Sequence, residues 1–279
     1  MSTGTVYCSA TMNYAVADGR SAVDVDVFDA RTEPPDDPGR EFDERGFTLL
    51  HHRSEVADWT DGAEIDEVHR DEVREVFQKL AGCDALAVYP GIVRSPDAAR
   101  QVADYAPIEL VHSDFTHDFH GMVTEADRPY QAFLQPVLDR AGLEHADVRR
   151  ARRIAMYQLW RNTGPERPDW PFALCDARSV PLERLVPVPI ADYGGLRLEF
   201  EIFTARPPET RSDDRWYTYP GLRTDEVIAL RTFDSERAQH GQPFWTLHSA
   251  FADPHVQSGA DGLVPHRESV EMRALCLWY

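Results

Sequence analysis

Lysine is almost absent from this chain. Of its 29 basic residues only Lys79 is a lysine, and it lies in an amphipathic stretch with no glycine-rich loop nearby. Schiff-base chemistry and phosphate-binding loops of the Walker type both need a positioned lysine. The sequence therefore excludes both classes, and any anionic ligand must be held by arginine.

Cysteine pairs and long apolar runs are also missing. The four cysteines form no Cys-x-x-Cys pair, which argues against a zinc cluster and a disulfide framework. No segment approaches about 18 consecutive apolar residues, and the first ten residues do not resemble an export signal. These absences predict a cytoplasmic protein that has no membrane partner.

Positive charge is scarce overall. The formal net charge is −19, and such a surface repels phosphate backbones and anionic lipids. Nucleic acid is therefore excluded as an expected partner.

The 42% hydrophobic content is sufficient for a sizeable core, and 279 residues fit a single domain covering 1–279.

The first part of the chain has two clear local patterns. Residues 32–44 are rich in proline and acidic side chains, which predicts an exposed loop. Asp61 and Glu64 have the spacing of a capping box, and apolar residues then recur at helical spacing as far as Gly82. This pattern predicts an amphipathic helix over 61–82.

The remainder is dominated by short apolar or alternating runs separated by turn residues. These runs are 84–89, 108–115, 153–160, 184–190, 196–203, 226–233, 243–251 and 270–279. They predict a mainly β protein with flanking helices, built on a double-stranded β-helix (jelly-roll) core. We expect residues 1–95 to form an N-terminal α/β elaboration and residues 96–279 to form the core, with a helical insert near 127–142.

The pattern His-x-Asp occurs three times, and only one copy is placed to bind a metal. Two residues separated by one position share a face of a strand, whereas they diverge on a helix. His69 lies in the predicted helix and His145 lies in a charged stretch. His112 and Asp114, in contrast, end the apolar run 108–115, so this pair is the candidate for metal ligation.

A second histidine from a neighbouring strand would complete a site of two histidines and one carboxylate, typical of non-haem Fe(II) oxygenases. The candidates are His240, His248, His255 and His266. His248 is favoured because it ends the apolar run 243–251, and a core histidine with only a structural role is the alternative. His117 and His120 form a competing pair, but they lie beyond the strand and are expected at the mouth of the site.

Arginine near the C-terminus offers an anion-binding site. On a strand, Arg267 and Ser269 share one face, and a guanidinium beside a hydroxyl suits a terminal carboxylate. Arg273 has the same parity and is an alternative.

Blocks spread over most of the chain resemble the hydroxylase/desaturase family of CmcJ- and AsaB-like proteins, which are iron(II)/2-oxoglutarate-dependent oxygenases or their relatives. The blocks are FDERGFTLLHHRSEVADWTD (42–61), VHSDFT (111–116), YQLWRN (157–162), PFALCDARSV (171–180), WYTYPGLRTDEVIALRTFDSER (216–237), LHSAFADP (247–254) and RESVEMRAL (267–275). The resemblance implies a jelly roll that holds Fe(II) through His112, Asp114 and His248. It also implies that 2-oxoglutarate chelates the metal and directs its far carboxylate to Arg267 and Ser269.

One segment departs from the family pattern. Where the family has Asn-x-Trp-Arg-Pro, this chain has Gln158-Leu159-Trp160-Arg161-Asn162, and Gln158 can still donate to a cosubstrate carboxylate. The ligand Asp114 is retained, which disfavours halogenation because halogenating relatives replace that residue.

The resemblance predicts an enzyme that uses Fe(II), 2-oxoglutarate and O₂ to hydroxylate or desaturate an unactivated C–H bond of a small natural-product intermediate. Arg161, Tyr217 and His117 are the candidate substrate contacts, with Trp216 and Tyr219 as further aromatic candidates that could equally belong to the core. Two alternatives stay open. One is a metal dioxygenase or epimerase that needs no 2-oxoglutarate, and the other is an accessory protein that works with a partner tailoring enzyme.

Overall fold

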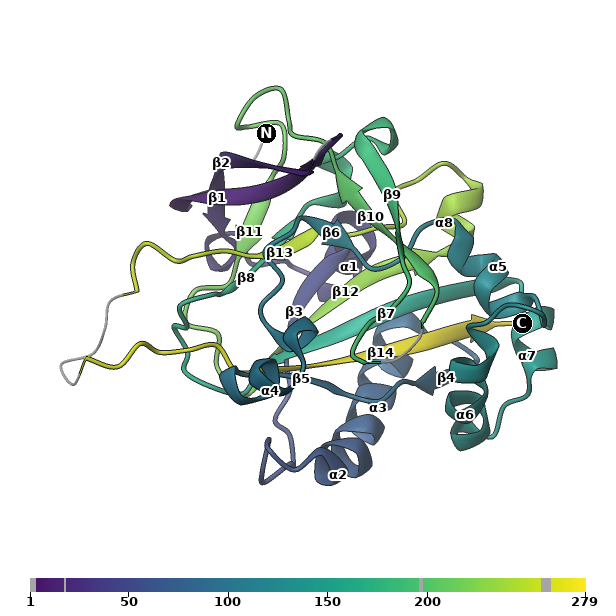
Figure 1. The fold of residues 1–279 in the computed structure, drawn as a ribbon. Helices are drawn as coiled ribbons and strands as arrows, with labels where there is room; N and C mark the ends of the chain where they lie inside the picture. Colours follow the sequence, from purple (N-terminus) through teal and green to yellow (C-terminus); the bar gives the residue numbers. More distant parts are fainter. Residues whose placement is uncertain (1–3, 18, 196–197, 257–261) are drawn as a thin grey trace.

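Two β-sheets face each other and form the body of the protein (Figure 1). The computed structural model describes residues 4–17, 19–195, 198–256 and 262–279. The architecture is mainly β with flanking helices, which confirms the predicted fold class.

The larger sheet contains eight strands and carries the histidines of interest. Its order is β1 (Val6–Val16), β2 (Gly19–Asp29), β11 (Trp216–Thr218), β8 (Phe172–Cys175), β13 (His248–Ala250), β6 (His112–Ser113), β10 (Phe200–Ala205) and β9 (Leu185–Ile190). The short strand β13 lies between β8 and β6, and its His248 pairs directly with His112. Backbone pairing therefore brings together two residues that are far apart in the sequence.

The smaller sheet is built around two long antiparallel strands. Its order is β3 (Phe47–His51), β12 (Glu226–Asp234), β7 (Arg153–Asn162), β14 (Ser269–Trp278) and β4 (Ala85–Val88), and β5 (Ile92–Arg94) also pairs with β14. Strands β7 and β14 stay in register from Ser269 opposite Asn162 to Trp278 opposite Arg153. Residues of one parity on β14 therefore face the interior between the sheets.

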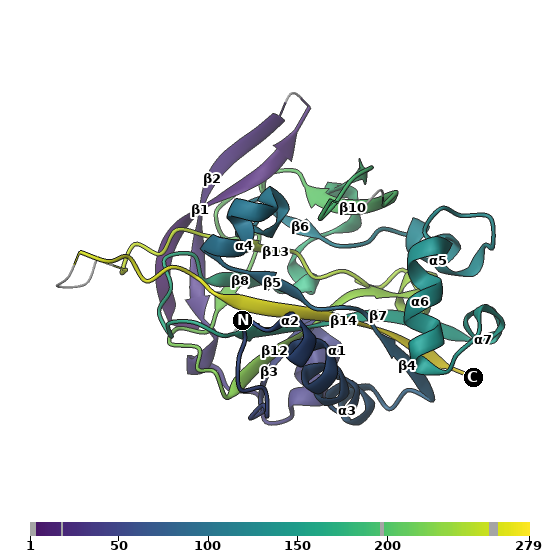
Figure 2. The ribbon, with the colours of Figure 1, turned by 60° about the horizontal axis from the view of Figure 1, so that its bottom comes forward.

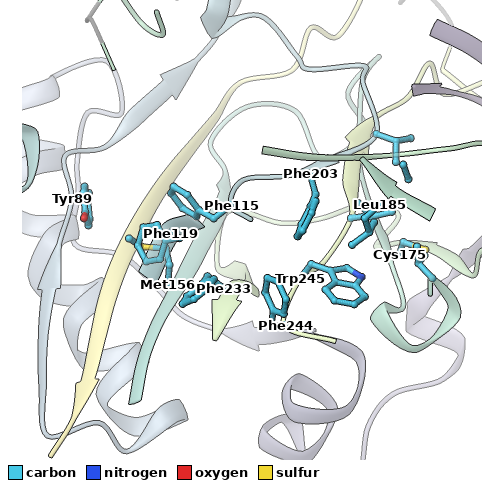
Figure 3. Close-up of a cluster of buried hydrophobic side chains, with 14 of the residues drawn as sticks. Tyr89, Phe115, Phe119, Met156, Cys175, Leu185, Phe203, Phe233, Phe244 and Trp245 are labelled. Atoms are coloured by element: carbon cyan, nitrogen blue, oxygen red, sulfur yellow. The ribbon is translucent and has the colours of Figure 1, made fainter. Parts of the chain in front are cut away.

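Aromatic side chains fill the space between the two sheets at one end of the molecule (Figure 3). The ring of Phe244 lies 5.9 Å from Phe203 of the larger sheet and 5.5 Å from Phe233 of the smaller sheet. Burying one such ring contributes about 1.5–3 kcal/mol. The segment before β13 thus holds the sheets together while His248 is presented at the start of that strand.

A long helical segment packs on the outer face of the smaller sheet (Figure 2), and Phe42 of the helix over 38–45 packs on the same face. The long segment consists of α2 (Gly62–Glu64), a π-helical turn (Ile65–His69) and α3 (Arg70–Ala81). Asp61 caps its start, and Gly82 ends it with a left-handed φ of 61°. Val73 and Phe77 are fully buried against the sheet, as expected for the amphipathic pattern over 61–82.

The remaining helices lie at the ends and edges of the sheets. They are α1 (Pro38–Arg45), α4 (Pro96–Gln101), α5 (Asp118–Thr124), α6 (Gln131–Ala141), α7 (His145–Arg150) and α8 (Ser235–Gln239). The helix α6 lies within the insert expected near 127–142. Of the eight predicted strand runs, the run at 196–203 is described from Leu198 onward, and Leu196 and Arg197 lie outside the described residues.

Residues 32–44 are not the continuous loop that their composition suggested. Asp37 caps the helix α1 by accepting from the main chain of Gly39, and Pro38 occupies its first position. Proline is compatible with this position because the first helical N–H has no partner within the helix. The proline that reads as a loop residue therefore starts a helix.

The boundary at residue 95 does not separate two layers of the structure. Strands β1 and β2 belong to the larger sheet, while β3, β4 and β5 belong to the smaller one. The N-terminal segment therefore completes both sheets of the core.

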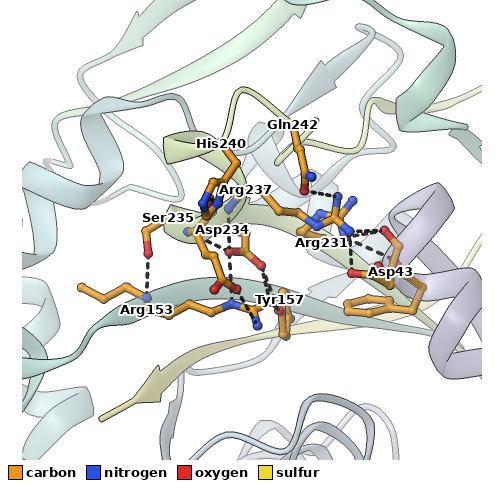
Figure 4. Close-up of polar contacts among 12 residues, drawn as sticks. Asp43, Arg153, Tyr157, Arg231, Asp234, Ser235, Arg237, His240 and Gln242 are labelled. Carbon is orange, nitrogen blue, oxygen red and sulfur yellow. Dashed lines mark hydrogen bonds and ion pairs between the residues drawn. The ribbon is translucent and has the colours of Figure 1, made fainter.

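A buried polar network fixes the corner where β7, β12 and α8 meet (Figure 4). Asp234 caps α8 and accepts from Arg153 at 2.6 Å and from the Tyr157 hydroxyl at 3.3 Å.

Within the described part of the chain, no helix combines the length and the apolar character needed to cross a bilayer.

Candidate active site

Three side chains converge at the junction of β6 and β13. Ligand atoms of His112, Asp114 and His248 all lie within 4.8 Å of one another, and all three residues are buried. Oδ1 of Asp114 lies 3.8 Å from Nε2 of His112 and 3.7 Å from Nε2 of His248. Two nitrogens and one oxygen thus surround a single point, which is the arrangement of a facial metal site.

The main chain orients both imidazole rings. Nδ1 of His112 lies 2.7 Å from the carbonyl oxygen of Leu110, and Nδ1 of His248 lies 2.9 Å from that of Thr246. A carbonyl can only accept, so each Nδ1 carries the proton and each Nε2 offers its lone pair to the shared point. Burial lowers the pKa of His112 to about 3 and also lowers the pKa of His248, which keeps both rings neutral for ligation.

Arg273 holds the carboxylate of the group. Its Nε donates to Oδ2 of Asp114 at 3.0 Å, which leaves Oδ1 directed at the imidazoles. Burial alone would raise the pKa of Asp114, but Arg273 and the two histidines outweigh it and hold this pKa well below its usual range. The carboxylate is therefore ionised and fixed before any ligand arrives.

Arg267 is a buried cation that has no carboxylate partner among the described residues. It is 5% exposed, and toward the residues that the structure describes its guanidinium makes one hydrogen bond, a 3.4 Å contact from Nη1 to the oxygen of Trp170. Burial lowers its pKa to about 9. Because an unpaired buried charge is costly, this guanidinium needs an anion that the described part of the chain does not supply.

Arg267, Ser269 and Gln158 each carry a buried polar atom without a partner. Nε of Arg267, Oγ of Ser269 and Oε1 of Gln158 are buried and have no hydrogen-bond partner. Buried polar groups are usually satisfied, so these unsatisfied atoms are compatible with a polar ligand. The two donors, Nε of Arg267 and the Ser269 hydroxyl, fit a carboxylate-bearing cosubstrate, and two histidines with one carboxylate fit Fe(II).

A cavity of about 620 Å³ connects the metal-ligand group to Arg267. His112, Asp114, His248 and Arg267 all line it, together with the indole of Trp160. Gln158 and Ser269 do not line the cavity, although Gln158 contacts Glu271, which does. The volume is within the range of small-molecule binding sites.

Arg94 and Glu271 complete the charged floor of the cavity, and sequence reasoning missed both. Glu271 lies between two guanidiniums, at 2.9 Å from Nη2 of Arg94 and 3.3 Å from Nη2 of Arg273. The parity that selected Arg267 and Ser269 also places Glu271 and Arg273 on the same face of β14. Extending that parity two residues beyond Ser269 would have found Glu271, whereas Arg94 lies on β5 and follows from no such pattern.

Comparison with known proteins matches this chain to one family along almost its whole length. A family model described as an oxidoreductase/YMDC permease-like domain matches residues 6–277. The "Alpha-ketoglutarate-dependent dioxygenase phiK" of a fungal species (strain ATCC 74256) is 30% identical over 85% of this chain and 79% of its own. The "Hydroxylase/desaturase CTB9" of Cercospora beticola is 24% identical over 85% of this chain and 72% of its own.

The chain belongs to the hydroxylase/desaturase family of iron(II)/2-oxoglutarate-dependent oxygenases. Among solved structures, the iron and alpha-ketoglutarate-dependent endoperoxidase NvfI aligns with a TM-score of 0.75 over 99% of both chains, at 20% identity. This likeness shows that the oxygenase has the fold of that jelly-roll enzyme.

Three predicted substrate contacts of the oxygenase are not among the residues that line the cavity: Arg161, Tyr217 and His117. Arg161 faces the α3 side of the smaller sheet, where it donates to the carbonyl oxygens of His52 and Thr224. Tyr217 packs in a separate aromatic cluster and accepts from Arg215. His117 lies edge-on against Phe244 at 4.6 Å.

The other histidines considered for the metal site have different surroundings. His69 bonds to Glu72, and His145 approaches the carbonyl oxygen of Val123. His240 lies at the end of α8, where its ring contacts the carbonyl of Glu236 (Figure 4). His255 contacts the oxygen of Tyr7, and His266 pairs with Asp169. The structure brings His248 alone of the four distal candidates to His112 and Asp114.

Proposed function

We propose that this oxygenase oxidises an unactivated C–H bond of a small natural-product intermediate, by hydroxylation or desaturation, using Fe(II), 2-oxoglutarate and O₂. The observation that carries this proposal is the convergence of two imidazole Nε2 atoms and one carboxylate oxygen on one point. Such a site leaves metal positions open for a cosubstrate and oxygen.

In this proposal His112, Asp114 and His248 hold the iron. Arg267 receives the far carboxylate of 2-oxoglutarate, with Ser269 and Gln158 as polar neighbours. The support is that Nε of Arg267 and the hydroxyl of Ser269 are buried without partners, whereas the unpartnered atom of Gln158 is an acceptor. When bound, iron with 2-oxoglutarate supplies the oxidising chemistry and releases succinate and CO₂.

The protein's own residues prepare the site. Arg273 fixes one oxygen of Asp114, and the carbonyls of Leu110 and Thr246 fix the tautomer of both histidines. These contacts orient the ligands before binding, which reduces the reorganisation required during the reaction.

The unpaired charge of Arg267 favours 2-oxoglutarate over the alternative of a metal dioxygenase or epimerase that needs none. That alternative would leave a buried guanidinium without an anion throughout its cycle. The other alternative, an accessory protein for a partner tailoring enzyme, predicts no turnover without that partner.

The test is an anaerobic titration with Fe(II), with and without 2-oxoglutarate, followed by visible absorption. We expect a charge-transfer band that requires both components, is absent in Asp114→Ala and fades in Arg267→Ala. Iron binding without the band would favour the enzyme that needs no 2-oxoglutarate. Failure to bind iron would contradict the proposed function.

A further inference from the structure

We propose that the substrate is an uncharged, largely apolar small molecule that enters as a free compound and not as an anion or a phosphate-bearing carrier conjugate. This inference rests on the proposed function, because it assumes that 2-oxoglutarate occupies Arg267. It concerns the part of the cavity that the iron and the cosubstrate leave open.

The first argument is the charge inventory of the cavity. Four arginines and five carboxylates line it, which gives a net charge of −1 when the two histidines are neutral. Fe(II) and the 2-oxoglutarate dianion cancel each other, so the loaded cavity keeps this net negative charge. An anionic substrate would therefore enter against the field of the site.

The second argument is that each buried arginine of the cavity has a partner once the cosubstrate is bound. Arg94 pairs with Glu271 at 2.9 Å, and Arg273 pairs with Asp114 at 3.0 Å. Arg267 is the buried guanidinium left over among the residues that line the cavity, and the cosubstrate takes it. No arginine at the metal end is then free to neutralise a substrate carboxylate or phosphate, and burying an unpaired charge there is costly.

The third argument is the character of the outer walls. Apolar side chains line this region and are left only half-buried by the protein: Ile92, Phe133, Ile190, Leu198, Phe200 and Ile202. Apolar surface that a protein does not cover gains about 25 cal/mol per Å² when a ligand removes it from water. These walls therefore bind a hydrocarbon or aromatic skeleton.

The fourth argument is the charge at the opening. Three exposed acidic residues, Asp104, Glu109 and Asp192, and one exposed arginine, Arg20, line this part of the cavity. The whole chain carries a formal charge of −19. Both the local and the overall field repel a phosphopantetheine arm or an acidic carrier protein, so the substrate is expected to arrive free.

Two fluorescent probes that share the same ring system test this inference. The neutral probe is N-phenyl-1-naphthylamine, and the anionic probe is 8-anilino-1-naphthalenesulfonate. Each is titrated anaerobically into protein loaded with Mn(II) and 2-oxoglutarate, which blocks Arg267 without turnover. We expect the neutral probe to bind at least about tenfold more tightly, because the sulfonate meets a negative cavity.

Variants locate the probe and test the charge argument. Phe200→Asp should weaken neutral-probe binding by about tenfold, since it places a charge on the apolar wall. The matched control Leu182→Asp changes an exposed leucine that does not line the cavity and should leave binding unchanged. Asp192→Arg should narrow the gap between the two probes by strengthening binding of the anionic one.

Two results would overturn the inference: equal or tighter binding of the anionic probe to the loaded wild type, or neutral-probe binding that does not respond to Phe200→Asp. Failure of the proposed function is read separately, from the Fe(II)–2-oxoglutarate absorption band in the absence of any probe. A normal band with preferred binding of the anionic probe would therefore reject the substrate class alone.

Discussion

Two clusters of histidine, carboxylate and arginine lie on opposite faces of the smaller sheet, and the polar atoms of the two clusters are bonded differently. The inner cluster consists of the proposed metal ligands His112, Asp114 and His248 together with Arg267. The outer cluster, His52, His69, Glu72 and Arg161, lies beneath the helical segment that contains α3. Each cluster also includes a tryptophan beside its arginine, Trp160 inside and Trp59 outside.

The outer cluster uses most of its polar atoms on the protein itself, although Nε2 of His69 and Nε of Arg161 are buried without a partner. Glu72 accepts from Ser54 at 2.7 Å, from the main chain of Glu55 at 2.7 Å and from Nδ1 of His69 at 2.7 Å. In the inner cluster, the main chain takes the Nδ1 atoms and leaves three ligand atoms directed at one point. Residue content does not define a metal site; the deciding feature is which atoms remain free and where they point.

The largest expected effect concerns iron affinity, and it distinguishes the two carboxylates Asp114 and Glu72. Asp114→Ala removes a ligand atom, so we expect iron affinity to fall more than about 100-fold and turnover to be lost. Glu72→Gln changes the outer cluster and should leave iron affinity within about twofold of wild type. Anaerobic iron titration of both variants measures the difference, and equal losses would show that the comparison is mistaken.

The next largest effect concerns the affinity for 2-oxoglutarate, and it distinguishes the two buried arginines Arg267 and Arg161. Arg267→Leu should weaken 2-oxoglutarate binding by about 100-fold or more, because it removes the counter-charge of the far carboxylate. Arg161→Leu should leave that affinity unchanged, since Arg161 bonds to the carbonyls of His52 and Thr224.

Thermal unfolding of the same pair without cosubstrate sharpens the contrast. Arg267→Leu should not lower the melting temperature, because it removes an unpaired buried charge, whereas Arg161→Leu should lower it by several degrees. A melting temperature that falls equally in both variants would contradict the view that Arg267 awaits an external anion.

A smaller effect is expected from Arg273→Leu, which keeps all three ligand atoms but frees Oδ2 of Asp114. Loss of such an orienting contact lowers metal affinity by about 10- to 100-fold. Arg273→Lys should recover part of this loss, because an ammonium retains the charge but not the directed Nε contact. Unchanged iron affinity in Arg273→Leu would remove Arg273 from the site.

The smallest effect is a pH dependence of stability in the outer cluster. Burial tends to raise the pKa of Glu72, but hydrogen bonds from His69, Glu55 and Ser54 outweigh it and lower this pKa from 4.5 to about 2. The carboxylate therefore stabilises the fold above about pH 4.5, and this contribution is lost as the pH falls from 4.5 towards 2.

We expect wild type to exceed Glu72→Gln by about 1–2 kcal/mol in free energy of unfolding at pH 6. The difference should shrink at pH 3. Urea unfolding at the two pH values measures it, and a difference that grows on acidification would reverse the assigned sign.

Strand parity explains which parts of the site could be predicted from the sequence. Arg267, Glu271 and Arg273 share one parity and meet at the cavity. Gln158 and Arg161 are three residues apart on β7, so they point to opposite faces, and both could not serve the same site. Consistent use of the two-residue period would have placed Arg161 on the face of the sheet opposite to that of Gln158.

Other features depend on contacts that no local pattern contains. Arg94 lies on a short strand, and its partners come from residues 104–106, 193 and 271. The pairing of His248 with His112 needs β13 to insert between β6 and β8. The sequence could suggest both histidines from their positions at strand ends, but the insertion depends on how the whole sheet is ordered.

The bonds of Arg94 have a consequence for how this enzyme can change over evolution. Its guanidinium donates to the main-chain oxygens of Asp104 and Ala106, next to the opening of the cavity, and also binds Glu271 at the metal end. Main-chain oxygens are present whatever side chain the residue carries. Residues 104–109 can therefore mutate to admit new compounds while Arg94 keeps the charged floor intact, so substrate range can diversify without rebuilding the metal centre.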